Sequence, residues 1–102
     1  MDRLATLLTM ARDKPNDPFL IFALALEYHG AGNEAESRSY FERLVNEFPD
    51  YVATYYQYGK MEEEKGNTAR AADLYRAGIN ISRAAGNAKT ARELQAALDM
   101  MD

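Results

Sequence analysis

The side chains most often used in catalysis are scarce in this 102-residue chain. Its one histidine is His29, and there is no cysteine, which excludes a cysteine nucleophile, a thiolate zinc site and a disulfide. A serine or threonine nucleophile needs a base that a third group holds in place, and no serine-centred turn motif precedes a predicted helix. Gly30-Ala31-Gly32 lacks the lysine and the spacing of a phosphate-binding loop. We therefore predict a protein that is not an enzyme and that uses no cofactor.

A metal site is not predicted either. His29 has no glutamate at the Glu-x-x-His spacing, and its neighbours Glu27 and Tyr28 point to other faces of a helix. Glu62-Glu63-Glu64 lacks the looped spacing and the glycine of a calcium site, so we interpret it as a solvated acidic run. We expect His29 to be packed in the fold or to lie at the rim of a groove.

Four tyrosines, Tyr51, Tyr55, Tyr56 and Tyr58, form a dense aromatic cluster. Three of them lie on or near one helical face, which favours core packing. Stacking on nucleic-acid bases would need basic neighbours, but an acidic run follows instead. The net charge is −4, and residues 27–65 carry nine acidic against four basic side chains. Because this segment repels a polyanion, we predict no nucleic-acid partner.

No segment is predicted to cross a membrane. The longest apolar run, Phe19 to Leu26, has eight residues, whereas a spanning helix needs about 20. The first eight residues lack a basic stretch followed by a long apolar one, so a signal peptide is not predicted. We expect a soluble, cytoplasmic protein without a membrane partner.

The elements that position these side chains are helices, because apolar residues recur at helical spacing and never alternate as in a strand. Asp17 before Pro18 is typical of a helix N-cap, and Pro49-Asp50 is expected to end one helix and cap the next. Glycine followed by asparagine, at residues 32, 66 and 86, predicts three helix ends at which the asparagine caps the next helix. Asn33 with Glu36 also fits a variant of the capping box. We predict six helices, consecutive ones antiparallel, at about 2–13, 17–30, 34–47, 51–65, 68–84 and 88–101.

The helices repeat with a period of 34 residues. Gly32-Asn33 recurs as Gly66-Asn67, and Pro15 recurs as Pro49. A small residue, Ala25 or Gly59, is expected to let the paired helix approach closely. An aromatic residue, Phe41 or Tyr75, is expected to fill the space between the two helices of a pair and the next pair. Val45 recurs in the same way as Ile79.

On these residues the chain resembles the tetratricopeptide-repeat (TPR) family. The family pattern is matched in the first unit by Ile21, Leu24, Ala25, Tyr28, Gly32, Phe41 and Pro49, and in the second by Tyr55, Tyr58, Gly59, Gly66, Ala71, Tyr75 and Gly78. Departures are Ser37 in place of alanine, Glu62 in place of an aromatic residue and Arg83 in place of proline. The resemblance implies an all-α, right-handed superhelical array in one domain, 1–102. Its segments are an N-terminal flanking helix (1–17), repeat 1 (18–51), repeat 2 (52–85) and a C-terminal capping helix (86–102).

The resemblance also implies where a partner binds, because the first helix of each unit lines the concave surface in this family. The corresponding groove residues are Phe19, Phe22, Leu26, His29, Ala53, Tyr56, Lys60, Glu63, Thr90 and Leu94. The expected function is a protein–protein interaction module or scaffold that holds a helix or an extended peptide. The lysine and asparagine clamp by which some members hold a C-terminal carboxylate is not present.

Two alternatives are open from the sequence. In the first, the flanking helices fold over the groove residues and bury them, and the apolar run 19–26 is then enclosed on all sides. A second copy of the chain is also able to occupy the groove, which would make the protein a self-associating structural module.

Overall fold

A computed structural model describes residues 2–101 of the chain, and within that range it contains six helices and no strand. Met1 and Asp102, which belong to the predicted flanking segments, lie outside the described residues. The helices are α1 (Arg3–Asp13), α2 (Pro18–Gly30), α3 (Glu34–Glu47), α4 (Ala53–Glu64), α5 (Thr68–Ala84) and α6 (Ala88–Asp99). The predicted all-α fold is confirmed, and the bounds of α3 and α5 agree with the prediction to the residue.

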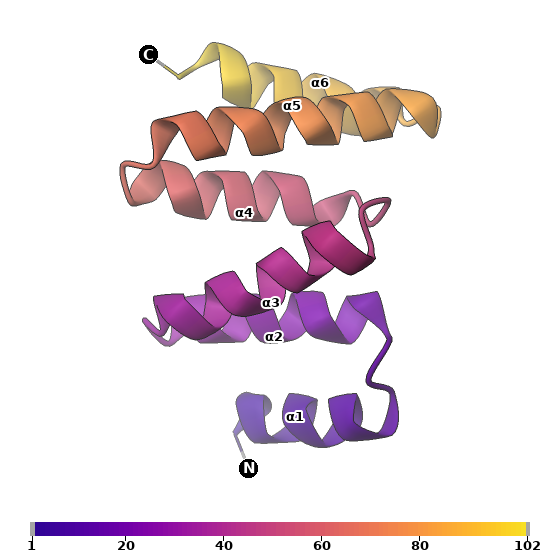
Figure 1. Cartoon of the computed structure of the whole chain (residues 1–102), viewed down its shortest axis with the longest axis vertical. Coiled ribbons are helices and arrows are strands. Elements are labelled where there is room, and N and C mark those ends of the chain that lie inside the picture. The colour runs from indigo at the N-terminus through magenta and orange to yellow at the C-terminus, as the bar shows by residue number, and fades with distance from the viewer. Residues whose placement is uncertain (1, 102) are drawn as a thin grey trace. The chain divides into compact units, whose positions relative to one another are not determined.

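The chain divides into two compact units, residues 1–51 and 52–102. In the first unit α1 packs on α2 and α2 packs on α3; in the second α4 packs on α5 and α5 packs on α6. Figure 1 shows the chain reversing direction from one helix to the next within each unit. The single domain over 1–102 stays a prediction.

Helix α2 is apolar around its circumference because other helices of the first unit cover it on two sides. Leu7 of α1 packs with Leu20, Ala23 and Leu24 of α2 in one cluster. On the α3 side, the buried Ser37 hydroxyl donates a 2.8 Å hydrogen bond to the Ala25 carbonyl. Serine in place of alanine is therefore tolerated at position 37, since its polar atom has a partner.

Each of the three Gly-Asn turns closes a helix by the same backbone geometry. Gly32, Gly66 and Gly86 have φ of 79°, 82° and 74°, a left-handed conformation that glycine adopts without a steric penalty. The asparagine N–H that follows each glycine donates to the carbonyl five residues earlier, at 2.9, 2.9 and 2.8 Å, as in a Schellman motif. The predicted helix ends are thus confirmed.

The asparagine side chains do not act alike. Asn33 and Asn87 accept hydrogen bonds from the third residue of the following helix, as predicted. The predicted cap at Asn67 is wrong, because its amide instead donates to a carboxylate oxygen of Glu62 at 2.8 Å. This bond provides a partner for Glu62, which is buried at a position where the family usually has an aromatic residue.

Two further capping predictions are corrected. The capping box at Asn33 lacks the second bond, from the Asn33 N–H to the Glu36 side chain. That N–H instead donates to the Tyr28 carbonyl at 2.9 Å. Asp50 does not cap the next helix: the cap position of α4 is Val52, which already has helical φ and ψ and makes no side-chain capping bond. By contrast, Asp17 caps α2 with Pro18 in the first turn, as predicted.

Two glycines in the second unit mark close helix contacts. A Cβ atom on Gly59 would lie 2.5 Å from the Tyr75 ring, and one on Gly78 would lie 2.6 Å from Tyr55 and 2.8 Å from Leu94. The expected role of a small residue at position 59 is confirmed. Because α4 and α6 both approach α5 at Gly78, the buried side chains on α5 form the centre of this unit.

Candidate functional site

The four predicted groove residues of α2 lie on one face of the helix, because they are spaced by three and four residues. Phe19 is 61% exposed, and Phe22, Leu26 and His29 are partly exposed. Helix α1 packs against the face that carries Leu20 and Leu24, so it leaves Phe19 accessible.

Phe22 and His29 are held by neighbours within the first unit. The Phe22 ring centroid lies 6.3 Å from that of Phe41 and 5.7 Å from that of Tyr51. His29 Nδ1 lies 3.1 Å from a carboxylate oxygen of Glu34, which orients the imidazole. Phe22 is therefore both a packing residue and a contributor to the exposed face, while His29 is a polar group on that face.

The predicted groove residues of α4 are all exposed. Ala53, Tyr56, Lys60 and Glu63 follow the same spacing as on α2, and Tyr56 is 39% exposed. The Tyr56 ring lies 6.4 Å from the ring of Tyr75, whose hydroxyl donates to Glu63 Oε1 at 2.9 Å. This face thus combines an aromatic side chain with one basic and one acidic group.

The Tyr75 hydroxyl makes the free energy of unfolding depend on pH in the alkaline range. Burial, followed by the hydrogen bond to Glu63 and nearby acidic groups, raises the pKa of the Tyr75 hydroxyl above its ordinary value. Above about pH 10 the unfolded chain loses this proton while the folded chain keeps it, so the free energy of unfolding falls with rising pH. Below that pH the contribution is fully present.

We expect Tyr75→Phe to lower the free energy of unfolding by about 0.5–1.5 kcal/mol at pH 7, through loss of the hydrogen bond to Glu63. The difference between the two proteins should shrink as the pH rises above about 10. Urea denaturation at pH 7, 9 and 11 measures it, and a difference that stays constant to pH 11 would contradict a raised pKa at Tyr75.

The two predicted groove residues of α6 have different environments. Thr90 is partly exposed, but Leu94 is fully buried against Gly78 of α5, so its assignment to the groove is wrong. Leu94 was assigned to the groove as the residue 34 positions after Lys60. That assignment requires the second unit to repeat the first throughout. Helix α5 has 17 residues and α3 has 14, since Arg83 stands where proline would end the helix. Leu94 lies on the face of α6 that packs on α5.

The tyrosine cluster belongs mainly to the core, as predicted. Tyr55 and Tyr58 are buried in the second unit, and Tyr51 packs on Phe22 in the first. Arg70 lies over the Tyr58 ring at 5.5 Å. Tyr56 is the member of the cluster that remains accessible.

Sequence reasoning missed Met10, which lies outside the apolar stripe of α1 and is 47% exposed. Met10 and Phe19 flank a pocket of about 210 Å³ at the turn between α1 and α2, with Leu20 among its lining residues. Asp13, Lys14 and Asp17 supply its charged groups. The signal was present in the sequence as an apolar residue off the helical stripe, but the spacing alone does not show that it meets Phe19.

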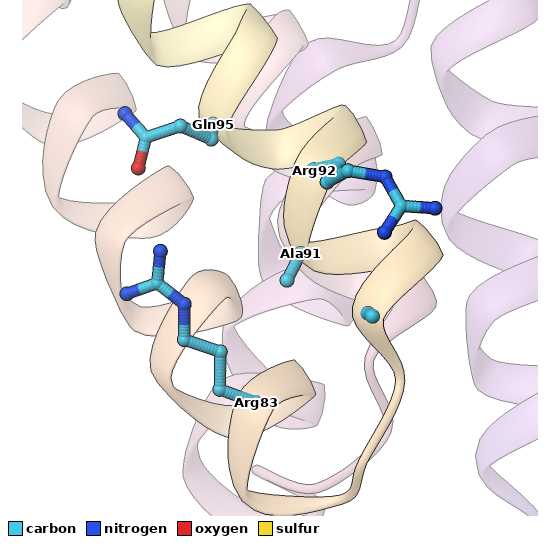
Figure 2. Close-up of a pocket in the computed structure, with 5 residues that line it drawn as sticks. Arg83, Ala91, Arg92 and Gln95 are labelled. Atoms are coloured by element: carbon cyan, nitrogen blue, oxygen red, sulfur yellow. The ribbon is translucent and has the colours of Figure 1, made fainter.

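A second pocket, of about 220 Å³, lies between α5 and α6 (Figure 2). Ala88 and Ala91 give it small apolar walls, and Arg83, Arg92 and Gln95 line it as well. Figure 2 shows the Arg83 guanidinium on the side of Gln95 and the Arg92 guanidinium pointing away from it. The two cations therefore do not converge on one anion. Across residues 2–101, no helix is long and apolar enough to span a membrane.

Comparison with known proteins identifies the fold. No protein-family model and no curated protein sequence matches the chain. A solution NMR structure of a tetratricopeptide repeat domain protein from Salinibacter ruber is 41% identical, with a TM-score of 0.83 over 86% of this chain and 89% of that one. A crystal structure of such a domain protein from the same organism is 42% identical, with a TM-score of 0.75 over 81% of this chain and 92% of that one. The chain therefore belongs to the tetratricopeptide-repeat family.

Proposed function

We propose that this chain, a helical-repeat module of a family generally used for protein–protein interaction, binds peptide or protein segments through exposed helix faces, that of α2 in the first unit and that of α4 in the second. The observation that carries the proposal is the 61% exposure of Phe19 on a helix whose other large apolar side chains are buried or partly buried. Exposing a phenylalanine in water gives up about 1.5–3 kcal/mol of burial energy, which a bound partner would recover.

The surroundings of Phe19 support this proposal. Met10 lines the same pocket as Phe19, and an unbranched thioether adapts its shape to different apolar partners. On α4, Tyr56 presents a ring with a polar hydroxyl, a residue type enriched among the side chains that dominate binding energy. Lys60 and Glu63 are exposed beside it and supply a positively charged hydrogen-bond donor and a negatively charged acceptor. An amphipathic helix or an extended peptide has the matching chemistry.

The proposal is tested by selecting binding peptides from a random displayed library and measuring their Kd by fluorescence anisotropy. We expect Phe19→Glu and Tyr56→Glu each to weaken the selected peptides at least about tenfold, since an aromatic contact is replaced by a charge. The two single variants also show whether one peptide contacts both helices. Phe22 is less suitable for this test because it packs on Phe41 and Tyr51.

Met100→Glu is the matched control, since Met100 is 84% exposed and lies outside both helix faces. It makes the same kind of apolar-to-acidic change and should leave the Kd unchanged. Circular dichroism should show all four proteins folded, and Tm should be unchanged for Phe19→Glu and Met100→Glu, while Tyr56→Glu should lower Tm slightly through lost contact with the Tyr75 ring. Equal Kd values for the wild type, Phe19→Glu and Tyr56→Glu would exclude both faces as the binding surface.

Self-association of the chain is the competing function, and it predicts a different result. If a second copy covers these faces, sedimentation velocity across a concentration series shows a dimer that Phe19→Glu or Tyr56→Glu dissociates. A monomer at all concentrations, with peptide binding retained, supports the proposal above.

A further inference from the structure

A pocket of about 240 Å³ lies in the first unit, lined by residues of α1, α2 and α3. Leu8 and Ala11 of α1 and Pro15 give it accessible apolar walls, and the buried Ile21 and Leu24 of α2 also line it. Arg12 and Arg43 line it as well, and none of the described residues around it is a carboxylate. Two cations around an apolar pocket are notable in a chain whose net charge is −4.

Arg43 is held in place by Pro15, which also lines the pocket, and by two side chains that do not line it. Its Nη2 donates to the Pro15 carbonyl at 2.9 Å and to Asn16 Oδ1 at 3.2 Å, and its Nε donates to Glu47 at 3.2 Å. These bonds tie α3 to the turn between α1 and α2. A guanidinium carries five N–H donors, so the two on Nη1 are left for a ligand.

Arg12 and Tyr40 add further donors. Arg12 is exposed and makes no hydrogen bond or ion pair with another residue in the described part of the chain. The Tyr40 ring stacks on Tyr28 at a centroid distance of 5.6 Å, which fixes its position in the wall of the pocket. The Tyr40 hydroxyl is a neutral donor at pH 7, since an ordinary tyrosine has a pKa of about 10. Burial, then Tyr28 and Glu36, raise this pKa further, against a smaller lowering by Arg43.

The dimensions of the pocket decide between a small molecule and a side chain. Small-molecule sites commonly have volumes of about 300–1,000 Å³, so this pocket is better suited to one large apolar side chain. Guanidinium groups bind carboxylates through charge-assisted and often paired hydrogen bonds. A large apolar side chain in the pocket and a carboxylate bound by the arginines at the same time would come from adjacent residues of one peptide.

We propose that this pocket is a second docking site, for a peptide segment in which an acidic residue adjoins a large apolar one. The apolar side chain lies against the partly exposed Leu8 and Ala11 and the exposed Pro15, and the carboxylate accepts hydrogen bonds from Arg12 and Arg43. The pocket opens at α1 and the turn after it, while the α2 residues that line it, Ile21 and Leu24, are buried. It is separate from the face that carries Phe19 and Phe22, and it does not depend on the function proposed above.

The test is an NMR titration of the ¹⁵N-labelled chain with two probes, acetyl-Leu-Glu-amide and its neutral isostere acetyl-Leu-Gln-amide. We expect the glutamate probe to shift the backbone amides of Leu8, Arg12 and Tyr40 and to bind at least about fivefold more tightly than the glutamine probe. Raising the salt concentration to about 0.5 M should weaken the glutamate probe alone, because the charged contact is partly exposed.

Arg12→Gln should bring the affinity for the glutamate probe down to that for the glutamine probe. It should leave Tm unchanged, since Arg12 has no partner within the described fold. Tyr40→Phe keeps the stacked ring and should weaken the glutamate probe by a smaller factor. Arg92→Gln, the same change at an exposed arginine of α6, is the matched control and should have no effect.

Three results would overturn the proposal. The first is equal affinity for the two probes, and the second is an affinity for the glutamate probe that Arg12→Gln does not change. The third is a shift of the Leu8 and Tyr40 amides with protein concentration in the absence of any probe, which would assign the pocket to a second copy of the chain.

Discussion

Leu94→Ala is expected to lower the free energy of unfolding by about 2–5 kcal/mol, the range found for buried leucines. Leu94 is fully buried, and its Cδ1 would lie 2.8 Å from a Cβ on Gly78, so the side chain packs directly on the α5 backbone. Removing three carbon atoms leaves a cavity where α6 covers α5. Because Gly78 has no side chain, its position offers no atoms to fill that space.

Urea denaturation followed by circular dichroism measures this loss. Thr90→Ala is the matched control on the same helix, since Thr90 is partly exposed, and it should change the free energy of unfolding by less than about 0.5 kcal/mol. If Leu94→Ala were as mild as the control, Leu94 would not be a core residue, and its place in the predicted groove would have to be reconsidered.

Gly59→Ala is expected to lower the free energy of unfolding by about 1–3 kcal/mol, although alanine is the better helix former. The new Cβ would lie 2.5 Å and 2.8 Å from two carbons of the Tyr75 ring, which is closer than real Cβ contacts. Tyr75 is buried, and its hydroxyl is bonded to Glu63, so the ring does not move aside without breaking that bond.

The first unit supplies a natural comparison for this prediction. Ala25 occupies the place of Gly59, and there Phe41, without a hydroxyl, occupies the place of Tyr75. In a Tyr75→Phe background, Gly59→Ala should therefore cost less than in the wild type, because the ring is no longer held by Glu63. A double-mutant cycle by chemical denaturation gives this coupling directly.

Gly30→Ala is the matched control, since a Cβ at this last residue of α2 meets no atom within 4 Å. It should leave stability unchanged or raise it slightly. If Gly59→Ala also raised stability, the contact of α4 with Tyr75 would be looser than the structure shows.

Local chemistry explains why the helix ends were predictable. A glycine in the left-handed conformation followed by asparagine needs only the preceding turn of helix to form its bonds, so α3 and α5 begin, and α5 ends, where the sequence indicates. Where a cap depends on a distant or competing partner, the prediction failed. Asn67 bonds to the buried carboxylate of Glu62 instead of the next helix, and only the folded unit shows that Glu62 needs this partner.

The candidate surfaces were predictable only in part, and for a related reason. The resemblance to the family implied that Phe19 and Tyr56 line a groove, and both side chains are exposed in the structure. The same step along the repeat failed at Leu94, which packs on Gly78 of α5. The pocket of Arg12 and Arg43 was not predictable, as the bond from Arg43 to Pro15 spans 28 residues.

The amino-acid sequence by itself determined the helices and the turns that separate them, because each depends on residue types within one or two helical turns of one another. The 34-residue repeat and the family follow from comparing equivalent positions of the two repeats, which also needs no tertiary structure. The tertiary structure alone decided which apolar side chains remain accessible, as with Phe19 and Met10, and which become core, as with Leu94. Exposure depends on what packs against a residue, and those neighbours are brought together only when the helices fold against each other.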